Sequence, residues 1–147
     1  MKYDPALFQG TAKYYAQYRP GYPSTFFDRL KEYFDLDGQG RLLDLGCGTG
    51  QVTLPLADSF EAAVALDPDP EMLAEGKRIA EDRGVTNISW LENVAEDISP
   101  ALGSFRLTTA AASFHWMDQD TVITKVHELT EPGGGVAIFS DSSSPWR

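Results

Sequence analysis

The segment 42–50, which reads LLDLGCGTG, constrains the fold more than any other part of the chain. Its apolar start predicts a short buried strand, and the glycines at alternate positions predict a tight turn directly after it. Residues 51–60 then have the pattern of a helix, with Pro55 in an early turn or at a kink. A buried strand, a glycine loop and a helix in this order predict the first unit of an α/β fold.

The rest of the chain repeats this alternation of apolar strands and amphipathic helices. Further strands are predicted at 62–66, 87–91, 105–110 and 136–139, and further helices at 24–36, from 68 or 70 to 83, and at 121–130. We expect Ser24 to cap the helix at 24–36 and Gly84 to end the helix that reaches residue 83. Residues 132–135 are expected to form a sharp loop. Strands that alternate with helices form a parallel sheet with helices on both faces, and ligands bind at the carboxyl ends of its strands.

Composition limits the partners of the chain. Its 147 residues fit one domain, and 12 basic against 22 acidic residues give a net charge of −10, which disfavours nucleic acid. No apolar run approaches the roughly 20 residues of a membrane span. No signal peptide is visible at the start, and the single cysteine, Cys47, cannot form an internal disulfide, so we expect a cytoplasmic protein.

An acidic residue marks the end of the second predicted strand. Asp67 follows the glycine loop by about 20 residues, the spacing at which a carboxylate accepts the hydroxyl groups of a ribose. Alternatively, Asp67 caps the helix that follows. The helix N-terminus after the glycines suits a carboxylate. The glycine loop and Asp67 together predict a nucleoside ligand with a negative or zwitterionic tail. The dinucleotide fingerprint is not met, because Gln51 stands where it needs glycine.

The order of five motifs resembles the class I S-adenosylmethionine-dependent methyltransferases. These motifs are LLDLGCGTG, VALDPDPEML, NVAEDIS, AAASFHWMD and LTEPGGGVAIF, and the resemblance runs from about residue 11 to residue 140. The opening YAQYRPGYP resembles small-acid methyltransferases of the trans-aconitate type. The resemblance implies a Rossmann-like, doubly wound sheet, mostly or all parallel, with strand order 3-2-1-4-5. It also implies methyl transfer from S-adenosylmethionine, with S-adenosylhomocysteine as product, to a small molecule, perhaps a carboxylic acid.

The same resemblance assigns a cofactor site. It implies that the glycine loop holds the methionine part of the cofactor, that Asp67 holds the ribose, and that Asp44 orients the loop or the amino group. Met72 either packs on the adenine or belongs to the core. Because Val94 cannot accept a hydrogen bond from adenine through its side chain, the Ala95 backbone or the Glu96 carboxylate must do so. The full set of expected cofactor contacts is Asp44, Gly46, Cys47, Gly48, Gly50, Asp67, Pro68, Met72, Ala95, Glu96 and Arg19.

Candidate residues for the substrate lie in two other segments. His115 follows the fourth predicted strand and is the one candidate for a catalytic base, although a structural hydrogen bond is the commoner role of such a residue. Trp116 either lines the substrate pocket or packs in the core. The aromatic segment 1–22 is expected to form a lid over the binding domain 23–147, with Arg19 pairing a carboxylate. His127 has no matching ligands, so no metal site is expected.

The sequence departs from the family pattern after 136–139. Family members continue with further strands, whereas this chain has only a short polar segment there, so it is either a fragment or a shortened protein. The last strand would then be a bare apolar edge, which favours a homodimer through that edge. Two other functions stay open: a non-catalytic cofactor-binding or assembly module, and a nicotinamide-dependent oxidoreductase.

Overall fold

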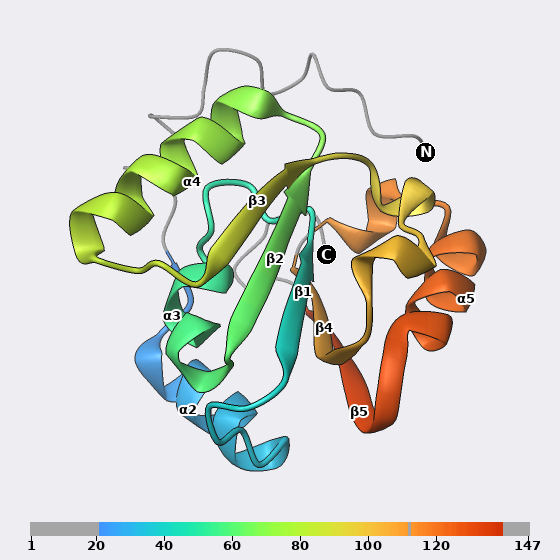
Figure 1. Ribbon diagram of the computed structural model, residues 1–147, viewed down its shortest axis with the longest axis horizontal. Coiled ribbons are helices and arrows are strands. Elements are labelled where there is room, and N and C mark those ends of the chain that lie inside the picture. The colour runs from blue at the N-terminus through green and yellow to red at the C-terminus, as the bar shows by residue number, and fades with distance from the viewer. Residues whose placement is uncertain (1–20, 112, 140–147) are drawn as a thin grey trace.

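The computed structural model describes residues 21–111 and 113–139, which form one parallel sheet with helices on both faces (Figure 1). The five strands are β1 Arg41–Leu45, β2 Ala62–Asp67, β3 Ile88–Glu92, β4 Phe105–Ala111 and β5 Thr130–Phe139. Their order across the sheet is β3-β2-β1-β4-β5, and every adjacent pair is parallel. The predicted Rossmann-like sheet and its strand order are therefore confirmed.

The helices divide between the two faces of this sheet. The α-helices are α2 Ser24–Tyr33, α3 Thr53–Leu56, α4 Pro70–Arg83 and α5 Gln119–Leu129; four 3-10 turns are η2 Ala57–Ser59, η3 Ala95–Asp97, η4 Pro100–Leu102 and η5 Phe114–Trp116. Figure 1 shows α2, α3 and α4 on one side of the strands and α5 on the other. This arrangement requires right-handed crossovers and brings the loops after β1, β2, β3 and β4 to one edge of the sheet.

Strand β1 buries its side chains on both faces because helices cover both. Leu42 packs in the cluster under α2 and α3, whereas Leu43 and Leu45 pack in the cluster under α5. All three are at most 1% exposed. Burial of each leucine contributes about 1.5–3 kcal/mol, so this central strand is held firmly against both helical layers. Asp44, the acidic residue of this strand, is 1% exposed and so equally buried.

Two predicted helices are shorter than expected. Residues 51–60 hold only the four-residue α3 followed by η2, because the turn that closes the glycine loop extends into residues 51 and 52. Pro55 lies in the first turn of α3, as expected. Helix α2 ends at Tyr33, because Asp35 has a φ of 51° and breaks the helical path. Pro23, not Ser24, occupies the N-cap position of α2.

The other helix and strand boundaries shift by a few residues. Helix α4 begins at Pro70, and Gly84 ends it in the left-handed conformation with a φ of 69°, as predicted. Strand β5 already begins at Thr130, so the loop predicted at 132–135 is wrong. The pairing of β4 with β5 jumps from Phe105–Thr130 to Leu107–Gly135, and the glycine-rich residues between these pairs form an irregularity within the strand.

Two features are absent from the described part of the chain. None of its helices has the length and apolar character needed to cross a membrane. Its His, Cys, Asp and Glu side chains form no group of three that could hold a metal ion.

Candidate functional site

The glycine loop after β1 is fastened to the end of β2. Three glycines of this loop have positive φ angles, of 63° at Gly46, 56° at Gly48 and 89° at Gly50, which L side chains rarely adopt. The Cys47 N–H donates to the Leu66 carbonyl at 3.0 Å. The Gly48 N–H donates to Asp67 Oδ2 at 2.9 Å. The loop and the predicted ribose-binding acid therefore meet at one point.

The Asp67 carboxylate lies within hydrogen-bonding reach of two backbone amides. Besides Gly48, the Asp69 N–H donates to Asp67 Oδ1 at 2.8 Å. Asp67 is 7% exposed, and this burial raises its pKa, while the two amide hydrogen bonds oppose that rise. Each carboxylate oxygen has a second lone pair and can accept one further donor. Asp67 does not cap α4: Asp69 does, accepting from Glu71 N–H at 2.9 Å and Met72 N–H at 3.4 Å.

Asp44 lies beneath the loop and is bonded to two threonines. Thr53 Oγ1 of α3 donates to Asp44 Oδ2 at 2.5 Å, and Thr109 Oγ1 of β4 donates to Oδ1 at 2.9 Å. The carboxylate thereby links β1 to the first turn of α3 and to the neighbouring strand. Burial raises the pKa of Asp44 to about 6, although both threonine hydrogen bonds act to lower it.

Several of the predicted site residues line one pocket. Its lining consists of Tyr22, Asp44, Gly46, Cys47, Gly48, Gln51, Val52 and Ala111. Burial, followed by the charges of Asp44 and Asp67, raises the pKa of the Cys47 thiol above its usual range, so this cysteine is an unreactive wall of the pocket. Four predicted residues (Asp44, Gly46, Cys47 and Gly48) therefore line one space, and Asp67 is bonded to its edge.

Other predicted residues lie along the same edge of the sheet without lining this pocket. Met72 is 4% exposed in the first turn of α4, and Pro68 is half-buried directly after β2. Ala95, also 4% exposed, begins η3 after β3. Glu96 follows it, and its Oε2 accepts the Asp118 N–H at 2.9 Å, so this carboxylate is directed toward the start of α5.

Sequence comparison identifies the family. A family model described as a methyltransferase domain matches residues 42–134, which contain the glycine loop, Asp67 and all of α4. The chain belongs to the methyltransferase domain family. With the strand order above, it is a class I S-adenosylmethionine-dependent methyltransferase domain, and the open alternative of a nicotinamide-dependent oxidoreductase is set aside.

Relatives of this methyltransferase domain are longer proteins. An uncharacterized methyltransferase of Mycobacterium tuberculosis is 34% identical over 124 residues, which cover 84% of this chain and 47% of the relative. An uncharacterized methyltransferase of Synechocystis is 33% identical over 101 residues, which cover 67% of this chain and 45% of the relative. The chain thus spans about half the length of the relatives that it matches.

Solved structures share the fold of this domain at low identity. A putative S-adenosylmethionine-dependent methyltransferase of Methanococcus maripaludis superposes with a TM-score of 0.76 and 20% identity, covering 95% of this chain and 65% of the other. The CcbJ methyltransferase of Streptomyces caelestis gives a TM-score of 0.76 and 22% identity, covering 92% of this chain and 58% of the other.

The predicted substrate residues of the methyltransferase domain lie beyond β4. His115 is exposed within η5, and its ring centroid lies 5.0 Å from that of Trp116, which is half-buried. Ser113, two residues earlier, donates from Oγ to the Leu45 carbonyl at 3.2 Å and so ties this turn to the end of β1. Arg19 and most of the expected lid 1–22 lie outside the described residues.

The sequence did not predict several residues that shape the site. Thr53 and Thr109 belong to no recognised motif, yet both donate hydrogen bonds to Asp44. The presence of an aspartate in the buried strand RLLDL could have indicated that such partners exist. The strand register pairs Thr109 with Asp44 directly, which only the sheet could reveal. In the sequence Gln51 stands out only as a departure from the dinucleotide fingerprint, whereas in the structure it lines the pocket.

Proposed function

We propose that this chain binds S-adenosylmethionine at the edge formed by the glycine loop and Asp67 and transfers its methyl group to a small molecule. The observation that carries the proposal is the hydrogen bond of 2.9 Å between Gly48 N and Asp67 Oδ2, which joins both halves of a nucleoside site. When bound, S-adenosylmethionine supplies a methyl group that is already activated on a sulfonium. The protein then has to position the acceptor and keep water away.

The residues at this edge fit such a cofactor. Asp67 has free lone pairs for two ribose hydroxyls, and the pocket beside Gly46 and Gly48 offers backbone to a polar end group. We assign Asp44 to positioning, because it is 1% exposed and its carboxylate joins β1 to Thr53 of α3 and to Thr109 of β4. The remaining expected contacts are retained in the proposal: Gly50, Cys47, Pro68, Met72, Ala95, Glu96 and Arg19.

Two titrations test the cofactor. S-adenosylhomocysteine should bind to the full chain in isothermal titration calorimetry, and the nicotinamide dinucleotide should not. A methyl-release assay over a panel of small acceptors, with carboxylic acids first, then tests transfer. Binding without methyl release would favour a non-catalytic cofactor-binding or assembly module over an enzyme, whereas absence of binding would contradict the proposed function.

We assign His115 to the acceptor side of the site, as a base that takes a proton at its free ring nitrogen from an oxygen or nitrogen acceptor. His115→Gln should lower kcat by no more than about 100-fold, the low end for a general base, because the activated methyl group needs little help, and it should leave S-adenosylhomocysteine affinity unchanged. Steady-state kinetics beside calorimetry measures both quantities. His127→Gln changes an exposed histidine of α5 and serves as the control. An unchanged kcat in His115→Gln would assign this residue a structural role.

We also propose that the segment 1–22 is a lid that becomes protected over bound cofactor. Tyr22, its last residue, lines the pocket beside the glycine loop and supports this assignment. Hydrogen exchange measured by mass spectrometry should show slower exchange in peptides from 1–22 after addition of S-adenosylhomocysteine. Peptides from α5 provide the internal reference. Equal exchange in 1–22 with and without the ligand would contradict the lid.

A homodimer through β5 is a further part of the proposal. In the described sheet β5 pairs only with β4, and two of its side chains, Val136 and Ile138, are 39% and 46% exposed. Ile138→Lys should convert a dimer into a monomer in light scattering at micromolar concentration, because an edge lysine blocks strand addition. Ile123→Lys alters a residue of α5 that is 42% exposed and should leave the dimer intact. A monomeric unmodified chain would contradict the dimer.

The cytoplasm is the proposed location, which the single buried Cys47 supports.

A further inference from the structure

Gly76 lies in the interior of α4, where glycine is an unfavourable choice. The residue is buried, and its φ angle is not among the positive ones, so the backbone conformation does not require a glycine there. Apart from proline, glycine is the least favourable residue in a helix interior. An isolated glycine within a helix therefore usually has a packing or functional reason.

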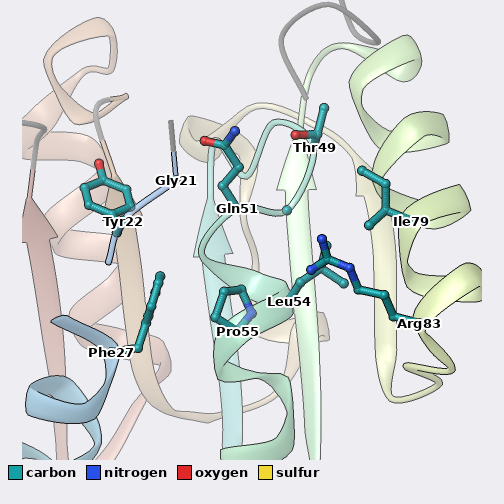
Figure 2. Close-up of a pocket in the computed structure, with 10 residues that line it drawn as sticks. Gly21, Tyr22, Phe27, Thr49, Gln51, Leu54, Pro55, Ile79 and Arg83 are labelled. Carbon is teal, nitrogen blue, oxygen red and sulfur yellow. The ribbon is translucent and has the colours of Figure 1, made fainter. Parts of the chain in front are cut away.

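Two segments distant in the sequence exclude a side chain at Gly76. A Cβ added there would lie 2.6 Å from Trp90 Cζ3 and 3.0 Å from the carbonyl oxygen of Thr49. Trp90 belongs to β3, whereas Thr49 belongs to the glycine loop after β1. Figure 2 shows Thr49 beside Ile79 of α4, and these two residues line one cavity. The absence of a side chain at Gly76 thus lets α4 approach the backbone of the loop directly.

The tip of the Trp90 ring contacts the glycine loop as well as α4. Its Cη2 atom would lie 2.8 Å from a Cβ added at Gly76 and also 2.8 Å from one added at Gly50. The ring packs against a buried cluster that contains Cys47 of the loop and Leu73 of α4. One aromatic side chain therefore contacts both the loop and the helix, in space that is open because both glycines lack a side chain.

We propose that Gly76 and Trp90 are positioning residues that hold the glycine loop in place for its ligand. Because protein interiors are close-packed, a methyl group added at Gly76 must displace the Trp90 ring or the Thr49 carbonyl. Thr49 directly follows Gly48, whose N–H donates to Asp67, so the displacement reaches the predicted nucleoside site. The consequence for cofactor affinity rests on the proposed function, whereas the packing itself does not.

Gly76→Ala should weaken S-adenosylhomocysteine binding about tenfold in titration calorimetry, because the added methyl group shifts the loop. Ala74→Ser adds one atom to an exposed residue of the same helix and should bind like the wild type. Urea unfolding of each variant measures stability separately. A changed free energy of unfolding in Gly76→Ala with wild-type affinity would reduce Gly76 to a structural role and overturn the inference.

A second substitution tests the ring by rescue. Phenylalanine lacks the two indole atoms that an added methyl group at Gly76 would meet. Trp90→Phe alone should bind S-adenosylhomocysteine somewhat more weakly than the wild type, because the ring tip no longer contacts the loop. In the Gly76→Ala protein, however, Trp90→Phe should strengthen binding, which two independent defects would not do. A double variant that binds no more tightly than Gly76→Ala would contradict the proposed role of the ring.

Hydrogen exchange in the free protein distinguishes this inference from the proposed function. The Gly48 amide, which donates to Asp67, should exchange faster in ¹⁵N-labelled Gly76→Ala than in the wild type or Ala74→Ser. If the wild type bound no S-adenosylhomocysteine, the proposed function would fail, yet faster exchange would still support positioning of the loop.

Unchanged exchange of the Gly48 amide in a folded Gly76→Ala protein would overturn the inference. If Gly76→Ala did not fold, Trp90→Phe alone would decide the question, since loss of the ring tip should also speed exchange of the Gly48 amide. Wild-type exchange in that variant would show that the loop does not depend on this packing.

Discussion

Replacing Asp67 with alanine is expected to weaken binding of S-adenosylhomocysteine about 10- to 100-fold. The Asp67 carboxylate holds the Gly48 and Asp69 amides and retains lone pairs for two ligand hydroxyls. The variant removes both the ligand acceptor and the link between β2 and the glycine loop. Titration calorimetry gives the affinity, and circular dichroism confirms that the helices persist.

Two further variants separate the ligand contact from a general loss of charge. Asp67→Asn keeps the size of the side chain and one acceptor oxygen, so its affinity should fall between those of the wild type and Asp67→Ala. Asp58→Ala removes a carboxylate whose side chain is 81% exposed in η2, before the start of β2, where its partner is Lys31, and it should bind normally. An Asp67→Ala protein with wild-type affinity would remove this residue from the cofactor site.

The order of the strands could be predicted because local pattern and global topology agree. Apolar runs such as 62–66 alternate with amphipathic segments, and parallel strands joined by right-handed crossovers leave few arrangements. The position of Asp67 could be predicted for the same reason: an acid at the end of the second strand must reach the edge where the glycine loop lies. The hydrogen bond between Gly48 and Asp67 is the outcome.

The sequence could not show why a side chain is excluded at these glycines, because the excluding contacts come from segments distant in the sequence. A Cβ added to Gly46 would lie 2.5 Å from Ser113 Oγ, and one added to Gly50 would lie 2.8 Å from Trp90 Cη2. These glycines accommodate other parts of the protein, in addition to the tight turn that the sequence predicted. Trp90 lies within β3 and Ser113 follows β4, so the local sequence around the glycines does not contain these partners.

The predicted boundaries of α3 and β5 were wrong for a related reason. A periodic apolar pattern predicted a helix over 51–60, but residues 51 and 52 form a turn after the glycine loop, and the α-helix covers only Thr53–Leu56 before η2 begins. Around Gly135 the chain looked like a turn from its glycines alone. The β4 edge nevertheless pairs with this segment, and an added Cβ at Gly135 would lie 2.6 Å from Phe34 Cε1.

Replacing Asp44 with asparagine is expected to raise the free energy of unfolding at pH 8 by about 1–3 kcal/mol. Burial raises the pKa of Asp44 from 3.8 to about 6, so the folded state binds its proton more tightly than the unfolded state. Stability from this group is therefore fully present below pH 3.8 and is lost as the pH rises through about 6. Asparagine has no such charge, and it can still accept from one threonine and donate to the other.

Urea unfolding between pH 4 and pH 8 measures this effect, with the two proteins compared at each pH. The stability advantage of Asp44→Asn over the wild type should be small at pH 4 and grow toward pH 8, because only the wild type carries the buried charge there. Asp58→Asn changes an exposed carboxylate and should follow the wild-type curve. A difference between Asp44→Asn and the wild type that stays constant with pH would show that Asp44 does not titrate in this range. A larger free energy of unfolding combined with weaker S-adenosylhomocysteine binding would mean that the domain retains a destabilising buried charge because Asp44 positions the glycine loop for its ligand.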